Sequence, residues 1–204
     1  AGSKSEIVMQ TAHTGAGNPY DHNWRMIGTK VIAAETADGI RAAIGPDTAA
    51  LGMVLSHNSE GHKLELDEMI AIAHKAGLPL ILDAGAEIPP VSNLKKFVQM
   101  GADLVAFSGG KNLRGPQCSG LLLGRKDLVE AAYANSAPHN HFARIAKVGK
   151  EEIVGLLTAV ELALQRDDEG ERRAQEAMLQ RVAGRLAGDR IVGHEDGAGS
   201  RRAA

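Results

Sequence analysis

Residues 78–111 read LPLILDAGAEIPPVSNLKKFVQMGADLVAFSGGK, a stretch that contains a complete strand–helix–strand unit. Its two apolar runs, Leu80–Leu82 and Leu104–Phe107, are short and nearly continuous, as is typical of strands buried on both faces of a sheet. Asn93–Met100 lies between them and is followed by Gly101, a residue that suits a helix end. The stretch therefore predicts two neighbouring parallel strands joined by a helix.

The same alternation extends in both directions along the chain. Further apolar runs predict strands at Ile7–Met9, Lys30–Ala34, Met53–Leu55 and Leu121–Leu123. Helical patterns run from Leu66 to a Gly77 cap, over Lys126–Ala134, from about Lys150 to Gln165, and over the charged segment Glu171–Leu186. In the third of these, one face is predicted to carry Ile153, Leu156, Leu157, Val160 and Leu164. Strands that alternate with helices predict an α/β fold with a mainly parallel sheet and flanking helices.

Composition narrows the function classes. The chain has 204 residues, of which 44% are hydrophobic, enough for a packed core. Its net charge of −2 gives no excess of basic side chains for binding nucleic acid. The single cysteine, Cys118, excludes an intrachain disulfide, and we expect it to be a small buried residue. No apolar run has the length of a membrane span, and the first residues lack a signal-peptide pattern, so we expect a cytoplasmic protein without a membrane partner.

Polar residues follow three consecutive predicted strands. Ser56 and His57 follow the run at 53–55, Asp83 follows the run at 80–82, and a Ser-Gly-Gly-Lys segment ending in Lys111 follows the run at 104–107. In open parallel sheets, ligands bind beyond the carboxyl ends of the strands. We therefore expect His57, Asp83 and Lys111 to line one edge of the sheet.

This combination of side chains suits one cofactor chemistry. A lysine amine forms a Schiff base with a carbonyl, and pyridoxal phosphate (PLP) enzymes use such a lysine, often with an aspartate at the pyridine nitrogen. The hydroxyl of Ser108 and the backbone N–H groups of Gly109 and Gly110 are suited to a phosphate. From spacing alone, an Asp–Lys ion pair at a loop edge is the favoured alternative.

A resemblance adds to this pattern. The run from Asp103 to Ala132, DLVAFSGGKNLRGPQCSGLLLGRKDLVEAA, resembles the lysine segment of the selenocysteine synthase-like group of fold type I PLP enzymes. That group includes L-seryl-tRNA(Sec) selenium transferase and D-glucosaminate-6-phosphate ammonia-lyase. The segments NPYDHNWRMIGTKVI (18–32), DAGAEIPP (83–90) and KVGKEEIVGLLTAVE (147–161) also fit, so that the resemblance covers roughly Ser5 to Ala163.

The resemblance implies a role for each matching residue. Lys111 matches the Schiff-base lysine, and Asp83 matches the aspartate that holds the pyridine nitrogen. Ser108 matches a phosphate contact, and Gln117 matches a residue that either contacts the phosphate or organises the loop. His57 matches a histidine near the cofactor. Arg144 and Lys147, with Arg114 as a further candidate, match positions suited to a substrate carboxylate or phosphate. For the pair His139 and His141, a loop is expected and no metal site.

The resemblance also implies organisation and function. We expect an incomplete fold type I large domain over residues 1–145 and a helical segment over 146–204 that leads into a truncated small domain. The implied activity is a PLP-dependent lyase that eliminates a β-hydroxyl from an amino acid or amino sugar acid, in a homodimer or larger homo-oligomer. The alternatives are selenium transfer to seryl-tRNA(Sec), and a catalytically silent relative that serves as a binding or assembly module.

Overall fold

The computed structural model describes residues 4–15, 18–55 and 64–186. The strands are β1 (Glu6–Gln10), β2 (Lys30–Ala34), β3 (Thr48–Val54), β4 (Leu80–Asp83), β5 (Leu104–Ser108) and β6 (Gly120–Gly124). The α-helices are α1 (His22–Met26), α2 (Ala37–Ala43), α3 (Leu66–Lys75), α4 (Asn93–Met100), α5 (Lys126–Asn135), α6 (Lys150–Ala163) and α7 (Asp168–Leu186). Short 3-10 turns are η1 (Thr11–His13), η2 (Pro19–Asp21) and η3 (Phe142–Ala146).

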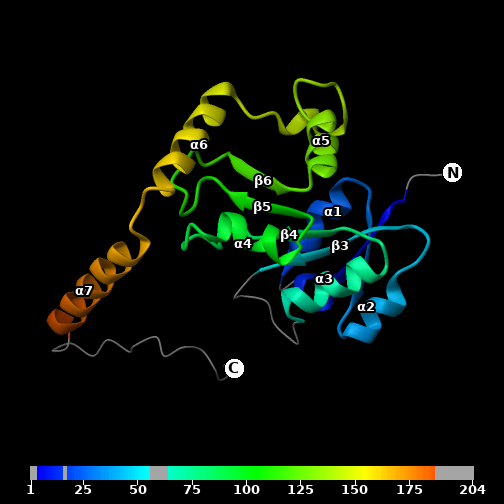
Figure 1. The fold of residues 1–204 in the computed structure, drawn as a ribbon, viewed down its shortest axis with the longest axis horizontal. Helices are drawn as coiled ribbons and strands as arrows, with labels where there is room; N and C mark the ends of the chain where they lie inside the picture. The colour runs from blue at the N-terminus through cyan, green and yellow to red at the C-terminus, as the bar shows by residue number, and fades with distance from the viewer. Residues whose placement is uncertain (1–3, 16–17, 56–63, 187–204) are drawn as a thin grey trace, which may run out of the picture. The chain divides into compact units, whose positions relative to one another are not determined.

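The strands form one sheet in the order β2-β1-β3-β4-β5-β6, and neighbouring strands from β3 to β6 can be followed in Figure 1. The first five strands are parallel, which confirms the predicted α/β class. Each predicted apolar run is a strand, but β3 starts at Thr48, upstream of the predicted start at Met53. The first half of β3 contains the small residues Ala49, Ala50 and Gly52, so it lacks the run of large apolar side chains that predicts a buried strand.

The last strand runs against the others. Strand β6 pairs antiparallel with β5, with Phe107 opposite Leu121. The residues between β5 and β6 form a loop without a helix. A parallel return needs a crossover connection, usually a helix, whereas an antiparallel partner needs only a loop. We call residues 109–119 the lysine loop, because they include Lys111.

Each face of the sheet carries a cluster of buried side chains. On one face, Val8, Leu51 and Leu82 pack in a cluster with residues of α2, α3 and α4, including Ile40 and Met69. On the other face, a smaller cluster of β1, β2 and β3 side chains packs against Tyr20 of η2 and Trp24 of α1. Burial on both faces explains the continuous apolar runs of β1 and β3. For β4 and β5 the expected burial on both faces was wrong, because their residues alternate between buried and half-buried.

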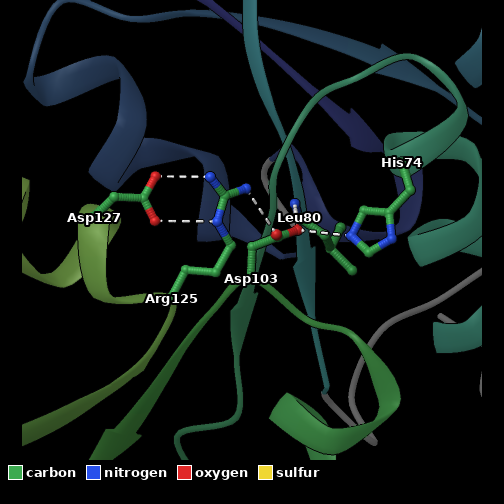
Figure 2. Close-up of polar contacts among 5 residues, drawn as sticks. All are labelled: His74, Leu80, Asp103, Arg125 and Asp127. Carbon is green, nitrogen blue, oxygen red and sulfur yellow. Dashed lines mark hydrogen bonds and ion pairs between the residues drawn. The ribbon is translucent and has the colours of Figure 1, made fainter.

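A buried carboxylate joins four elements at the amino-terminal edge of β4 and β5. Asp103 lies immediately before β5, and its carboxylate accepts hydrogen bonds from Leu80 N (2.8 Å), His74 Nε2 (3.0 Å) and Arg125 Nη1 (3.1 Å). Figure 2 shows these bonds and the further ion pair between Arg125 and Asp127 of α5. Burial alone raises the pKa of Asp103, but the three hydrogen bonds outweigh burial and hold this pKa below its usual value.

Helix α6 buries a different side from the predicted one. The fully or largely buried residues are Leu156, Ala159 and Ala163, whereas Ile153 and Leu157 are more than half exposed. Leu156 belongs to the main core cluster. Its Cδ1 lies close to two glycines of the lysine loop, so small residues in that loop decide which side of α6 faces inward.

The chain divides into two compact units, Ala1–Arg166 and Asp167–Ala204. Helix α6 therefore belongs to the same compact unit as the sheet, and the division into a large domain over 1–145 and a segment leading into a small domain over 146–204 stays a prediction. In the second unit, α7 has no buried residue, which confirms the predicted charged surface helix. Arg172 pairs with Glu169 and Glu176 one turn away on each side, and such pairs stabilise an exposed helix. In the part of the chain that the structure describes, no helix is both long and apolar enough to cross a membrane.

Candidate active site

Strands β4 and β5 place two predicted site residues at one edge of the sheet. Asp83 is the last residue of β4 and pairs with Ala106 of β5, and Ser108 is the last residue of β5. The two strands are parallel, so both side chains stand at the carboxyl edge, and both are half-buried. This edge is opposite to the one that holds Asp103, because Asp103 precedes β5.

Gly85 lies where three of the predicted residues converge. Its N–H donates to Asp83 Oδ1 at 2.9 Å. A methyl group built on Gly85 would lie 3.0 Å from Asp83 Oδ1, 3.6 Å from Lys111 Nζ and 4.0 Å from Ser108 Cβ. The structure thus brings a carboxylate, a primary amine and a serine around a position that carries no side chain.

The lysine loop is folded on itself. Gly109 N donates to Ser119 O (2.9 Å), Gly115 N donates to Gly109 O (2.8 Å), and Arg114 N donates to Lys111 O (2.8 Å). Arg114 has a φ of 62°, the left-handed conformation that closes the turn after the lysine. The loop therefore presents Lys111 from a defined backbone.

Helix α6 packs directly on this loop. A methyl group built on Gly109 would lie 2.9 Å from Leu156 Cδ1, and one built on Gly115 would lie 3.3 Å from the same atom. A methyl group built on Gly155 of α6 would lie 2.7 Å from Pro116 Cγ. Three glycines thus allow a contact between helix and loop that larger residues would block.

The structure places the other predicted residues less closely. Gln117 lies against the backbone of Gly110, since a methyl group there would be 2.7 Å from Gln117 Oε1. Arg114 is exposed on the same loop. His57 lies outside the described residues, so its predicted position near the cofactor stays a prediction.

Arg144 and Lys147 lie in and just after η3, away from the loop in sequence. Arg144 is half-buried and Lys147 is exposed. Within residues 4–15, 18–55 and 64–186, no hydrogen bond or ion pair joins either side chain to Asp83, Ser108 or Lys111. Their predicted role toward a substrate anion stays a prediction.

Two smaller expectations concern the cysteine and the histidine pair. The expectation of a buried Cys118 was wrong: the thiol is exposed next to Gln117, because the loop segment that carries it faces outward. His139 lies in a loop and stacks edge-on against Tyr133, with ring centroids 5.1 Å apart. Among the described residues, no group of three or more His, Cys, Asp or Glu side chains is placed to hold a metal ion.

The end of β1 carries buried polar residues that the sequence analysis missed. Gln10 and His13 are fully buried, and within the described part of the chain the side-chain amide of Gln10 has no hydrogen-bond partner at either its nitrogen or its oxygen. Asp21 is also buried; burial raises its pKa, but the bonds from Arg25 and from the Gly15 N–H keep that pKa below its usual value. Only β3 separates β1 from β4, so these residues lie at the same carboxyl edge as Asp83. The signal was available, since QTAH follows an apolar run as the polar segments after β4 and β5 do.

Comparison with known proteins places this geometry in a family context. A family model described as L-seryl-tRNA selenium transferase (SelA) matches residues 27–189. The chain is 34% identical over 190 residues to D-glucosaminate-6-phosphate ammonia lyase of Salmonella typhimurium, covering 90% of this chain and 48% of that protein. It is 34% identical over 198 residues to a 5'-C-glycyluridine monooxygenase-decarboxylase of Streptomyces, covering 93% of this chain and 47% of that protein.

A solved structure of D-glucosaminate-6-phosphate ammonia-lyase superposes with a TM-score of 0.71 at 34% identity, over 80% of this chain and 44% of that chain. The chain therefore spans about half the length of the first two curated relatives and of this structure.

Proposed function

The chain belongs to the L-seryl-tRNA selenium transferase (SelA) family and has the α/β fold of fold type I PLP enzymes, and on that premise we propose that it is the lysine-bearing segment of a PLP-dependent lyase. The proposed substrate is an amino acid or an amino sugar acid. The observation that carries the proposal is the convergence of Asp83, Ser108 and Lys111 around Gly85.

The residues at this position fit PLP. A lysine amine can capture an aldehyde, a carboxylate can accept a hydrogen bond from a protonated ring nitrogen, and a serine hydroxyl can donate to a phosphate. Gly85 leaves open the space between these groups, as a flat ring requires. When bound, PLP supplies an aldehyde and an electron-withdrawing ring that makes the substrate's Cα proton acidic.

The candidate site residues then have separate proposed roles. The amine of Lys111 would hold the cofactor through its aldehyde and, when free, would remove the proton from the substrate's Cα. Asp83, whose carboxylate is oriented by the Gly85 N–H, would keep a proton on the ring nitrogen. Loss of a β-hydroxyl and hydrolysis would release ammonia and a keto acid. For the substrate's carboxylate or phosphate, Arg114, Arg144 and Lys147 are the proposed cationic contacts.

The 34% identity to D-glucosaminate-6-phosphate ammonia lyase supports elimination as the reaction. The Streptomyces monooxygenase-decarboxylase is equally similar, so the assay must separate the two chemistries. Ammonia and keto acid released from phosphorylated amino sugar acids without oxygen uptake would support a lyase. Oxygen-dependent release of carbon dioxide would contradict it.

Selenium transfer to seryl-tRNA(Sec) is the second candidate, and the description of the matching family model favours it. The net charge of −2 argues against a tRNA partner for these residues, because phosphate contacts need clustered basic side chains. A tRNA gel shift that weakens as salt is raised would support selenium transfer. Absence of a PLP adduct in a folded chain would instead favour the silent binding module.

The direct test uses borohydride trapping. The purified chain is mixed with PLP, its visible absorbance is recorded, and the protein is reduced and mapped by peptide mass spectrometry. We expect one phosphopyridoxyl group, on Lys111, and none in Lys111→Ala. Lys126→Ala is the matched control, because Lys126 is highly exposed and should not be the labelled residue. Equal labelling of many exposed lysines would refute the assignment.

A further inference from the structure

Asn112, the neighbour of Lys111, ties the lysine loop to two other elements. Its side-chain Nδ2 donates to Ile88 O at 2.7 Å, in the segment that follows Asp83 between β4 and α4. Its backbone oxygen accepts a hydrogen bond from Arg166 Nη1 at 2.8 Å, just beyond the end of α6. One residue therefore connects the loop that carries the amine with the segment that continues from the carboxylate.

The amine has no comparable tie of its own. Lys111 is exposed, and in the described part of the chain its Nζ makes no hydrogen bond or ion pair. A lysine side chain has several rotatable bonds, so the position of its amine depends on where the backbone holds its Cα. The bonds that close the base of the loop, such as Gly109 N to Ser119 O, connect the loop to itself and not to the segment after Asp83.

We propose that Asn112 is a positioning residue that fixes the backbone of Lys111 relative to Asp83. The proposal rests on the proposed function, because the position of Lys111 relative to Asp83 matters only if both residues bind the same cofactor. Asn112 does not touch the reacting atoms; it acts through the backbone it shares with Lys111. Arg166 supports the same position through its hydrogen bond to the backbone oxygen of Asn112.

The first measurement needs no cofactor. Amide hydrogen exchange is followed by mass spectrometry in wild type, Asn112→Ala and Asn135→Ala. Asn135 is the matched control, because its Nδ2 also donates to a backbone carbonyl, Ala131 O at 2.9 Å, but in α5. We expect the lysine loop of Asn112→Ala to exchange about tenfold faster, since local opening governs exchange, and that of Asn135→Ala to match wild type. Unchanged exchange in Asn112→Ala would overturn the proposal.

The second measurement is PLP trapping. We expect half-saturation of the Lys111 adduct to need about tenfold more PLP in Asn112→Ala, because the amine is then held less firmly near Asp83. A tenfold change corresponds to about 1.4 kcal/mol in binding. Arg166→Ala should shift half-saturation in the same direction, and it decides the question if Asn112→Ala does not fold by circular dichroism. Equal half-saturation in wild type and the folded variants would overturn the proposal while the proposed function stands. If wild type forms no Lys111 adduct, the proposed function fails and the exchange measurement alone supports or overturns the role of Asn112.

Discussion

Replacing Asp103 with alanine should lower the free energy of unfolding by about 2 kcal/mol, because it leaves a buried backbone N–H without an acceptor. The magnitude follows from the three donors in Figure 2. Leu80 is fully buried, so its N–H cannot turn to bulk water when the carboxylate is gone. The His74 and Arg125 side chains are 47% and 53% exposed and can be hydrated instead, so their loss adds little.

The assay is urea denaturation at neutral pH, followed by far-ultraviolet circular dichroism. Asp127→Ala is the control, because Asp127 pairs with the same arginine but is mostly exposed, and its unfolding midpoint should match wild type. A change below about 0.5 kcal/mol for Asp103→Ala would refute the reasoning, since that is the scale of an ordinary surface substitution. It would mean that water reaches Leu80 N–H freely.

The pH dependence of this variant gives a second check. The pKa of Asp103 is lower in the folded chain than in an unfolded one, because the hydrogen bonds from Leu80, His74 and Arg125 outweigh its burial. Stability from a carboxylate with a lowered pKa is complete above its unfolded pKa of about 3.9 and is lost as the pH falls through the folded pKa. The gap in stability between wild type and Asp103→Ala should therefore be constant near neutral pH and narrow below about pH 4. A gap that widens in acid would contradict this assignment.

Three further outcomes can be measured on the same preparation. Gly85→Ala should fold normally but need more than about tenfold more PLP for borohydride trapping, because the new methyl group would crowd Asp83 and Lys111; equal trapping would show that this space is not used. Leu156→Ala should cost about 2–4 kcal/mol in urea denaturation, since it removes a core contact between α6 and the lysine loop, and a loss near zero would place that contact outside the core. Cys118 should react with a thiol reagent in the folded chain as fast as in urea, because it is exposed, and protection in the folded state would contradict its position.

The sequence predicts the centre of the sheet well, and the reason is physical. Strands β4 and β5 alternate between buried and half-buried residues, and both faces are apolar enough for their runs to stand out, so that the first polar residues after them mark the carboxyl edge. Asp83, Ser108 and Lys111 converge because parallel neighbouring strands end at the same edge. This part of the site requires only that β4 and β5 be parallel neighbours. The strand–helix–strand pattern over residues 78–111 predicts both properties.

Other features depend on contacts that local pattern does not contain. The run Leu121–Leu123 looks the same in a parallel and an antiparallel strand, and the short connection to β5 decides between them. On α6, both Leu156 and Leu157 suit an apolar side, and the lysine loop decides which of the two is buried. Gln10 was missed for a different reason: the polar segment after the first apolar run signals a position at the carboxyl edge, but the burial of its amide without a partner among the described residues follows only from the tertiary fold.

The glycines around Lys111 meet two different requirements, space for a ligand and close packing of the loop and helix α6. The sequence alone does not tell these two kinds of glycine apart. Gly85 faces the carboxylate and the amine, so its missing side chain leaves room for a ligand. Gly109 faces Ser119 of the loop itself and Leu156, and Gly115 faces Leu156, so their missing side chains let the loop fold closely and α6 approach it. A methyl group at Gly85 should therefore reduce cofactor trapping without loosening the loop, whereas one at Gly109 should displace both Ser119 and the helix and increase hydrogen exchange throughout the loop. If both substitutions changed exchange equally, ligand space and helix packing would be a single feature, and the case for a preformed site at Gly85 would fail.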